Sequence, residues 1–519
     1  MDYDLIIIGG GINGAGIARD AAGRGLKTLL VDAQDLGAAT SSASTKLIHG
    51  GLRYLEQYDF KLVQESLHER ERLLKAASHI IWPMKFVLPH HKDLRPYWMI
   101  KLGLKLYDFL AGSTSLPPSR AIHFKPGHPL KNDFKQGFSY SDCWVEDSRL
   151  VVLNAIDAYR RGAKIMPRTM AHQITPITDR GQSGWTVKLE NMFTGDFFDI
   201  TAEIVVNAAG PWVGEILKNT NMSTDFNAPN VRLVKGSHII VRRLYDDDYA
   251  HILQQKDGRI IFAIPYEHNY TLIGTTDHKF DGDPANVVIS DEEKAYLCQA
   301  VNDAFKKQIT IDDIVWDYSG VRPLFDDGNA NASKVTRDYK IHFDRDEKHG
   351  SAMFSIFGGK ITTYRTLSEE VMNRVCSLFP DKNLPSWTYK TLKYPLPGGD
   401  FKQEFENFVQ QKQNQYSFLP PDLCRRYCRA YGSEIDVLLK NKRTIHELGH
   451  HYGAHIYEAE IIYLVQYEFA FLLDDILWRR SKLGLHCDEQ TKQAIEADLP
   501  RIYDIARNAE DYYESIACY

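Results

Sequence analysis

The first 32 residues restrict the fold of this chain more than any other segment. Residues 4–8 are apolar, which predicts a buried strand, and they lead directly into a glycine-rich turn. A helix is expected over about 13–25, and a second strand ends at Asp32. A strand–turn–helix–strand unit predicts a parallel sheet covered by helices. The fold class is therefore α/β, with α+β character over the chain as a whole.

The turn has the spacing of a dinucleotide-binding site. Gly9, Gly11 and Gly14 form a GxGxxG pattern, in which the first glycine permits the tight turn, the second lets a pyrophosphate approach the backbone, and the third lets the helix pack on the sheet. Ile12 and Asn13 open the helix, whose free N–H groups point at the phosphates. The aspartate that ends the second strand can accept hydrogen bonds from an adenosine ribose. The unit predicts NAD or FAD and does not decide between them.

The segment that follows this unit favours FAD. An NAD enzyme usually continues with further strands and helices, whereas residues 33–56 are rich in small and hydroxyl-bearing side chains. Such a segment suits a long, extended cofactor that needs donors along its length. Cofactor contacts are expected from Ser42, Ser44, Thr45, Leu47, His49 and Gly50.

Two later segments add to the expected cofactor site. A strand near residues 203–206 runs into small residues, among them Ala209 and Gly210, which let the chain pass close to a cofactor. Gly359 precedes a helix that begins near residue 361, with Lys360 and Thr362 at its start. The positive end of that helix, together with Lys360, is suited to the electron-rich pyrimidine edge of a flavin.

Bulk properties exclude several classes of protein. A chain of 519 residues is expected to form two or three domains. The net charge of -6 leaves no basic excess for binding nucleic acid. Seven cysteines without a CxxC pair predict reduced thiols and no metal site. We also expect no export signal and no membrane-spanning helix, because the chain starts directly with a strand and has no apolar run of about 18 residues.

Longer motifs carry a resemblance to a known family. They are "GGGINGAGIARDAAGRGLKTLLVD", "ATSSASTKLIHGGLRYLE", "VKGSHII", "IGTTD", "SGVRPL", "GGKITTYRTLSE" and "WRRSKLGL". In this order, from Tyr3 to about Leu485, they closely resemble the aerobic, FAD-dependent glycerol-3-phosphate dehydrogenases of bacteria. The resemblance implies FAD as cofactor, glycerol 3-phosphate as substrate, and ubiquinone or menaquinone as electron acceptor. It also implies a cytoplasmic protein attached peripherally to the inner membrane, with a homodimer as the expected assembly.

The resemblance assigns expected roles to substrate-site residues. Arg53 and Arg322 come from distant segments, and two guanidinium groups suit a phosphate dianion. His238 is the first candidate for the base that removes the proton of the C2 hydroxyl, and His49 is the second. Further substrate contacts are expected from Tyr54, Thr276 and Asp277.

The segment "LRPYWMIKLGLKLYDFLAG" reads as an amphipathic helix with Lys101, Lys105 and Asp108 on one narrow stripe. Its pattern fits a buried helix and a helix in a lipid interface equally well, and the resemblance favours the interface. The expected division is an FAD-binding segment (1–80), a membrane-facing segment (81–135), a return to the FAD-binding domain (136–215), a strand-rich substrate domain (216–345), a second return (346–388) and a helical cap (389–519).

Three alternatives remain open at this stage. An oxidase of the same architecture would pass electrons to oxygen and form peroxide. A related amine or amino-acid oxidase would need only one carboxylate-binding arginine, so a second would be surplus. A catalytically silent dinucleotide-binding protein would hold the cofactor without being reduced by any polyol phosphate.

Overall fold

The computed structural model describes most of the chain. The described residues are 1–91, 94–178, 183–222, 231–255, 257–325, 338–380, 382, 384, 394–509 and 511–513, with the side chains of 53, 56 and 57 left out.

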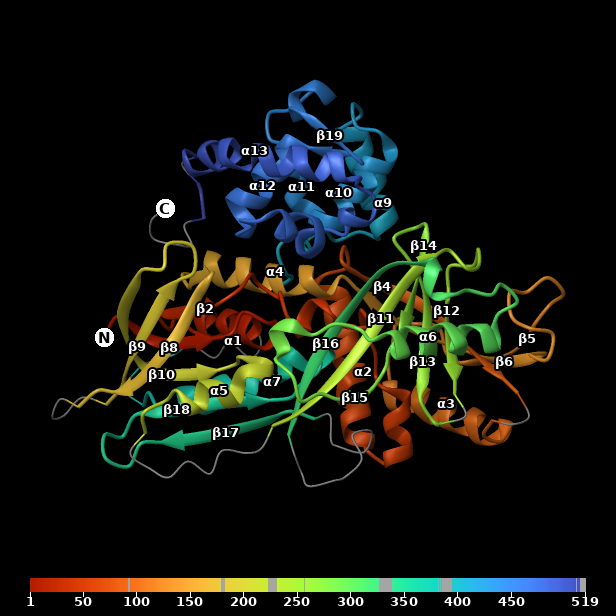
Figure 1. Ribbon diagram of the computed structural model, residues 1–519, viewed down its shortest axis with the longest axis horizontal. Helices are drawn as coiled ribbons and strands as arrows, with labels where there is room; N and C mark the ends of the chain where they lie inside the picture. Colours follow the sequence, from red (N-terminus) through yellow and green to blue (C-terminus); the bar gives the residue numbers. More distant parts are fainter. Residues whose placement is uncertain are drawn as a thin grey trace.

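The first sheet contains the predicted strand–turn–helix–strand unit (Figure 1). Its parallel centre has the order β18 (Ala352–Phe357), β10 (Phe197–Asn207), β1 (Tyr3–Ile8), β2 (Thr28–Asp32) and β7 (Lys164–Pro167). Antiparallel strands β17 (Lys340–Arg345), β9 (Trp185–Asn191) and β8 (Thr169–Pro176) extend it. Strands from distant parts of the chain therefore meet in one parallel sheet, as the α/β prediction requires.

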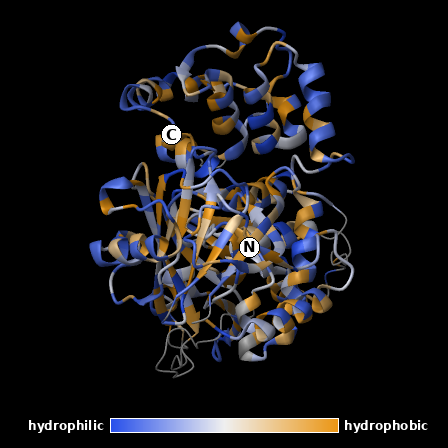
Figure 2. Ribbon diagram, turned by 90° about the vertical axis from the view of Figure 1, so that its right-hand side faces the viewer, coloured by the Kyte–Doolittle hydropathy of each residue, from blue (hydrophilic) through white to orange (hydrophobic). Residues whose placement is uncertain are grey.

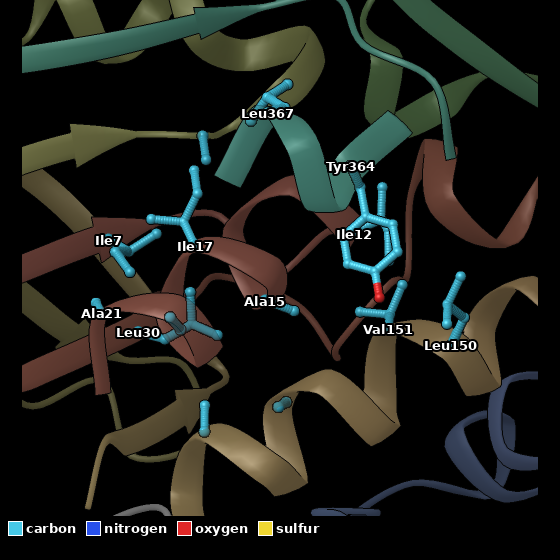
Figure 3. Close-up of a cluster of buried hydrophobic side chains, with 14 of the residues drawn as sticks. Ile7, Ile12, Ala15, Ile17, Ala21, Leu30, Leu150, Val151, Tyr364 and Leu367 are labelled. Atoms are coloured by element: carbon cyan, nitrogen blue, oxygen red, sulfur yellow. The ribbon is translucent and has the colours of Figure 1, made fainter. Parts of the chain in front are cut away.

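Helix α1 (Ile12–Gly23) is buried along nearly its whole length. It packs between α4 (Asp147–Arg160) and α7 (Tyr364–Cys376), and Figure 3 shows Ile12 and Ala15 near Tyr364 and Val151. Gly16 permits this contact, because a Cβ there would lie 2.6 Å from Ser368 Oγ. A continuous apolar core thus fixes the helix that opens the glycine-rich turn.

The second sheet lies beside the first and is mostly antiparallel. Its order is β15 (His278–Lys279), β11 (Val231–Arg242), β14 (Tyr270–Gly274), β13 (Ile260–Tyr266), β12 (Ala250–Gln254), β4 (Ile81–His90), β6 (Gln136–Val145) and β3 (Leu47–Ile48). Strand β16 (Ile314–Phe325) also pairs with β11, and β5 (Arg120–His123) pairs with β6.

Helices cover both faces of the second sheet. Ile239 and Val241 of β11 pack towards α6 (Asp291–Ala304), whereas Ile240 belongs to the apolar cluster on the opposite face. That second cluster includes side chains of α2 (Phe60–Ala76) and α3 (Tyr97–Ala111). The alternation of β11 places neighbouring residues on opposite faces, so a site on one face is built from every second residue.

The structure confirms the fold class but divides the two sheets differently from the expectation. Residues 81–90 were expected in a membrane-facing segment and residues 136–145 in the FAD-binding domain, yet β4 and β6 pair over ten residues inside the second sheet. The pairing joins strands that are separated by α3, so periodicity along the chain could not reveal it. The other boundaries of the expected division stay predictions.

The carboxy-terminal region forms the expected helical cap, a separate layer above the sheets (Figures 1 and 2). Its helices include α9 (Phe405–Gln415), α10 (Pro421–Tyr431), α11 (Ile435–Leu438), α12 (Glu458–Glu468), the π-helix η9 (Asp475–Arg480) and α13 (Glu489–Arg507). They enclose an apolar core of their own.

Buried ion pairs join the cap to the first sheet. Arg149 of α4 donates to Glu468 of the cap, with 2.9 Å between Nη2 and Oε1. Arg479 and Arg480 of the "WRRSKLGL" motif both donate to Asp35, which follows β2. The sequence left open what these two arginines contact, and the structure shows that they dock the cap on the first domain.

We expect Glu468→Gln to lower the free energy of unfolding by about 3 to 5 kcal/mol, because it leaves the buried Arg149 charge uncompensated. Denaturant unfolding followed by tryptophan fluorescence, with FAD in excess, measures the change. Glu406→Gln is the control, since the Arg425–Glu406 pair is mostly exposed and should change stability by less than about 1 kcal/mol. Equal effects of the two substitutions would contradict a stabilising role for the Arg149–Glu468 pair.

Candidate active site

The glycine-rich turn brings three backbone segments into close contact. Gly9 has φ +112°, and a Cβ there would lie 2.4 Å from the carbonyl oxygen of Ala208, which follows β10. A Cβ on Gly14 would lie 1.8 Å from the carbonyl oxygen of Gly9. No larger side chain fits at either position, so the ends of β1 and β10 and the start of α1 converge here. Ala209 donates its N–H to Asn207 Oδ1 at 3.3 Å.

The start of α1 is prepared for an anionic group. Its N-cap residue, Gly11, makes no side-chain capping hydrogen bond, while Ile12 donates its N–H to Ser41 Oγ at 3.0 Å. Asp32 accepts the N–H of Gly10 at 2.6 Å and that of Gln34 at 2.7 Å. These contacts hold the Asp32 carboxyl beside the turn, and burial raises its pKa to about 6.

The turn after β18 lies against the start of α1. Asn13 donates through Nδ2 to the carbonyl oxygen of Gly358 at 3.2 Å, and a Cβ on Gly359 would lie 3.1 Å from Asn13 Nδ2. Thr362 Oγ1 lies 3.4 Å from His49 N and 3.5 Å from His49 O. Three segments predicted to contact a cofactor are therefore brought together.

The Gly50–Gly51 pair is held by residues that sequence reasoning missed. Gly50 donates its N–H to the Tyr107 hydroxyl at 2.8 Å, and that hydroxyl donates to Asp142 Oδ2 at 2.8 Å. Arg70 closes the buried network with a 2.6 Å ion pair to Asp142. Arg70 and Asp142 lie on different elements without a shared motif, so no local signal could have identified them.

Two predicted substrate residues follow this glycine pair. Gly51 has φ +79° and precedes the 3-10 helix η2 (Leu52–Gln57). Within η2, the ring of Tyr54 lies under Lys360, with 3.7 Å between Nζ and the ring centroid. The Arg53 side chain lies outside the described part of the chain, so its expected role stays a prediction.

His238 occupies a closed position on β11. Its side chain is 1% exposed, and its ring stacks on Tyr318 of β16 with 4.7 Å between centroids. Gly274 on the neighbouring strand makes room for it, because a Cβ there would lie 2.1 Å from His238 Cδ2. The Nε2 atom lies 2.9 Å from Thr45 Oγ1. Burial, followed by the positive charges of Arg322 and Lys46, holds the pKa of His238 well below its usual value.

The other predicted substrate residues divide into two groups. Arg322 Nη1 forms a 2.9 Å ion pair with Asp277, and both side chains are partly exposed. Thr276 is fully buried; it accepts the N–H of Ser237 at 2.9 Å and donates to Glu293 Oε1 at 2.7 Å. The Thr276 hydroxyl therefore links β11 to α6, and its expected contact with the substrate stays a prediction.

The remaining predicted cofactor contacts have protein partners of their own. Ser42 Oγ donates to the carbonyl oxygen of Ala39 at 3.1 Å, and Ser44 Oγ donates to Asp147 at 2.8 Å. Leu47 is a buried residue of β3 that pairs with Trp144. Gly210 adopts φ +56° after β10. For the two serines and Leu47, backbone groups are the better candidates for contacts with a cofactor.

The residues present fit an extended dinucleotide. Helix α1 offers an N-terminus that lacks a side-chain cap, and Asp32 offers a carboxylate at the adenosine end. The 39–51 segment continues from this end towards His238 and Lys360. FAD would be held by the start of α1 at its pyrophosphate and by the 39–51 segment along its length.

Comparisons with known proteins agree with this arrangement. Residues 4–365 match the family described as FAD dependent oxidoreductase, and residues 389–508 match the C-terminal domain of alpha-glycerophosphate oxidase. An aerobic glycerol-3-phosphate dehydrogenase of Escherichia coli is 46% identical over 94% of this chain and 96% of its own length. A D-erythritol 1-phosphate dehydrogenase of Brucella abortus is also 46% identical, over 95% of this chain and 96% of its own.

A solved structure shares the fold over nearly the whole chain. The glycerol-3-phosphate dehydrogenase of Bacillus halodurans, complexed with FAD, has a TM-score of 0.75 and 28% identity, and the match covers 99% of this chain and 92% of that one. The resemblance drawn from the motifs is confirmed, and so is FAD as the cofactor. The chain belongs to the FAD dependent oxidoreductase family, and within it to the group that includes the aerobic glycerol-3-phosphate dehydrogenases of bacteria.

Proposed function

We propose that this protein oxidises sn-glycerol 3-phosphate to dihydroxyacetone phosphate and passes the electrons to a membrane quinone. The observation that carries the proposal is the placement of a cation and a neutral imidazole on one face of β11. A Cβ on Gly236 of β11 would lie 3.0 Å from Arg322 Nη2, so this guanidinium lies over Gly236. His238 is two residues further along β11 on the same face, and the rise of a strand puts it about 6.8 Å from Gly236. The separation of the two groups suits a small molecule with a phosphoryl ester beside a secondary alcohol.

Each protein group then has a definite task. His238 is neutral near pH 7, so it can accept the proton of the C2 hydroxyl. Arg322 binds the phosphoryl group, together with Arg53, and Asp277 orients Arg322. Lys360 would stabilise the negative charge that a bound flavin gains on reduction. FAD, when bound, supplies the N5 atom that accepts the hydride from C2.

Two alternatives, one for the electron acceptor and one for the substrate, have specific support, and the experiment below distinguishes them. The cap matches a domain named after an oxidase, which favours oxygen as the acceptor. One of the relatives at 46% identity is named for D-erythritol 1-phosphate, a longer polyol phosphate. Both alternatives keep the same hydride transfer and differ in acceptor or in substrate length.

We further propose that α3 attaches the protein to the cytoplasmic face of the inner membrane. Leu104, Tyr107 and Ala111 face the interior, whereas Trp98, Leu102 and Phe109 are 65%, 61% and 79% exposed. An apolar face flanked by exposed lysines suits a lipid interface. Among the described residues, no helix is long and apolar enough to cross a membrane. We also propose that the protein forms the homodimer expected from the resemblance.

Anaerobic reduction of the flavin is the first test. We expect glycerol 3-phosphate to bleach the yellow protein promptly, and a soluble quinone to restore the colour much faster than oxygen. Rapid recovery with oxygen and formation of peroxide would identify the oxidase. Faster bleaching by D-erythritol 1-phosphate would identify that compound as the preferred substrate. No bleaching by either compound would contradict the proposed function.

Substitution tests the assignment of the base. His238→Gln should slow anaerobic flavin reduction by about 10²- to 10⁴-fold while FAD stays bound, because general-base catalysis contributes about that much. His49→Gln is the comparison, since His49 contacts Thr362 through its backbone. A large loss in His49→Gln with little change in His238→Gln would exchange the two roles.

The same assignment predicts a pH dependence. Because the pKa of His238 lies well below 6.5, the imidazole stays neutral as the pH falls through 6.5. At saturating glycerol 3-phosphate the rate constant of flavin reduction should therefore be level from about pH 8 to about pH 6.5 and fall only in more acidic solution. Stopped-flow absorbance measures it, and a midpoint above 6.5 would contradict a depressed pKa in the complex.

Membrane attachment is tested by placing charged side chains on the exposed face of α3. Leu102→Asp combined with Phe109→Asp should abolish sedimentation with liposomes of inner-membrane lipid, because both side chains lose their apolar contact with the bilayer. Val288→Asp is the matched control, since Val288 is 72% exposed but lies far along the chain from α3. Flavin reduction by glycerol 3-phosphate should be unchanged in both variants. Retained sedimentation of the α3 variant would contradict the proposal.

A further inference from the structure

Lys46 has an unusual backbone conformation beside the candidate base. Its φ is +60°, a region that costs a residue with a long side chain about 1 kcal/mol or more. Its side chain is fully buried and forms a 2.7 Å ion pair with Asp147, which is also fully buried. The surrounding structure must therefore hold Lys46 in place, and such strained positions are concentrated at functional sites.

Asp147 fixes the residues on both sides of Thr45. It accepts hydrogen bonds from Ser44 Oγ at 2.8 Å and from Lys46 Nζ at 2.7 Å. Tyr318 adds a third connection, because its hydroxyl donates to the carbonyl oxygen of Ser44 at 2.7 Å. The Lys46 ammonium lies 5.2 Å from the centroid of the Tyr318 ring. Thr45 thus sits in a segment whose neighbours are both held by one buried carboxylate.

The consequence appears at His238. The Tyr318 ring stacks on one face of its imidazole, and Thr45 Oγ1 lies 2.9 Å from Nε2. The Nδ1 atom is buried and has no hydrogen-bond partner among the described residues. A neutral imidazole carries one proton, so the nitrogen that donates to Thr45 leaves the other with a free lone pair.

We propose that Thr45 is a positioning residue: its hydroxyl oxygen accepts the N–H of His238 Nε2 and so reserves Nδ1 as the atom that takes the substrate proton. The buried Lys46–Asp147 pair holds Thr45 at this distance. The inference rests on the proposed role of His238 as the base. It also gives Thr45 a different task from the cofactor contact expected from the sequence.

Several charged or titratable groups surround His238 and must stay unchanged in a test. Lys46 and the guanidinium of Arg322 are the cations that act on it. Tyr318 lies on its ring, and Asp277 pairs with Arg322. Glu293 of α6 bonds to the neighbouring Ser237. Thr45 itself is uncharged, so replacing it changes the hydrogen bond without changing this charge environment.

The test compares Thr45→Val, which has the same shape without a hydroxyl, with Thr45→Ser, which keeps the hydroxyl. In anaerobic stopped-flow with glycerol 3-phosphate, Thr45→Val should lower the rate constant of flavin reduction at pH 7 at least about 30-fold, because a catalytic histidine held in the wrong tautomer can lose far more than this. The dissociation constant of the substrate should change less than about threefold. Thr45→Ser should stay within about fivefold of the native rate.

Two further readouts separate positioning from a purely structural effect. The native rate should be level above pH 8, whereas the Thr45→Val rate should rise with pH as hydroxide replaces the base. In the ¹⁵N spectrum of histidine-labelled protein, with the His238 signals identified by their absence in His238→Gln, Nδ1 should be unprotonated in the native protein and in Thr45→Ser. Thr45→Val should show a mixture of the two neutral tautomers, because no hydrogen-bond partner then selects one of them. This spectrum needs no substrate.

The outcomes distinguish this inference from the proposed function. A native protein that glycerol 3-phosphate does not reduce would overturn the function, while the ¹⁵N spectrum would still decide the tautomer. Native-like rates in Thr45→Val, or equal losses in Thr45→Val and Thr45→Ser, would overturn the inference. A protonated Nδ1 in the native protein would do the same.

Discussion

The contact between Gly14 and Gly9 is the constraint on which the rest of the structure depends. A Cβ on Gly14 would lie only 1.8 Å from the Gly9 carbonyl oxygen, so α1 can approach β1 as closely as it does only with glycine there. This approach lets α1 run between α4 and α7 inside the apolar core. It also places the start of α1 at the glycine-rich turn, where a cofactor phosphate would bind. The other segments of the site are arranged around this one contact.

Buried carboxylates join the parts that the chain order keeps apart. Asp35 joins the cap to β2 through Arg479 and Arg480, Asp142 joins α2 and α3 to the glycine pair at Gly50, and Asp147 joins the 44–46 segment to α4. Desolvation makes each such pair expensive, and an apolar replacement is often no less stable. Asp142 and Asp147 each fix a segment of the candidate site, and Asp35 fixes the position of the cap. This favours a role in specifying geometry over a role in adding stability.

Helix α3 shows how one element can serve two surfaces. Its Tyr107 hydroxyl reaches inward and holds the Gly50 N–H, while Trp98, Leu102 and Phe109 remain exposed on the other side. In Figure 1 this helix lies at the end of the molecule away from the cap. The exposed side chains proposed to meet lipid and the Gly50 backbone predicted to contact the cofactor are therefore separated by the width of a single helix. The proposed transfer of electrons to a membrane quinone needs such closeness.

The sequence alone determined the glycine-rich unit, the α/β class, the helical cap and the family, because local residue spacing and long continuous motifs are enough to predict them. It also selected His238, Arg322 and Lys360 as candidates. It did not reveal that β4 and β6 belong to the second sheet, because strand pairing joins residues far apart in the chain. The partners of Thr45, Gly50 and Asp35 were hidden for the same reason. Only the tertiary structure decided which hydroxyl meets His238 and which carboxylate holds it there, since a hydrogen bond depends on distances that spacing along a chain does not fix.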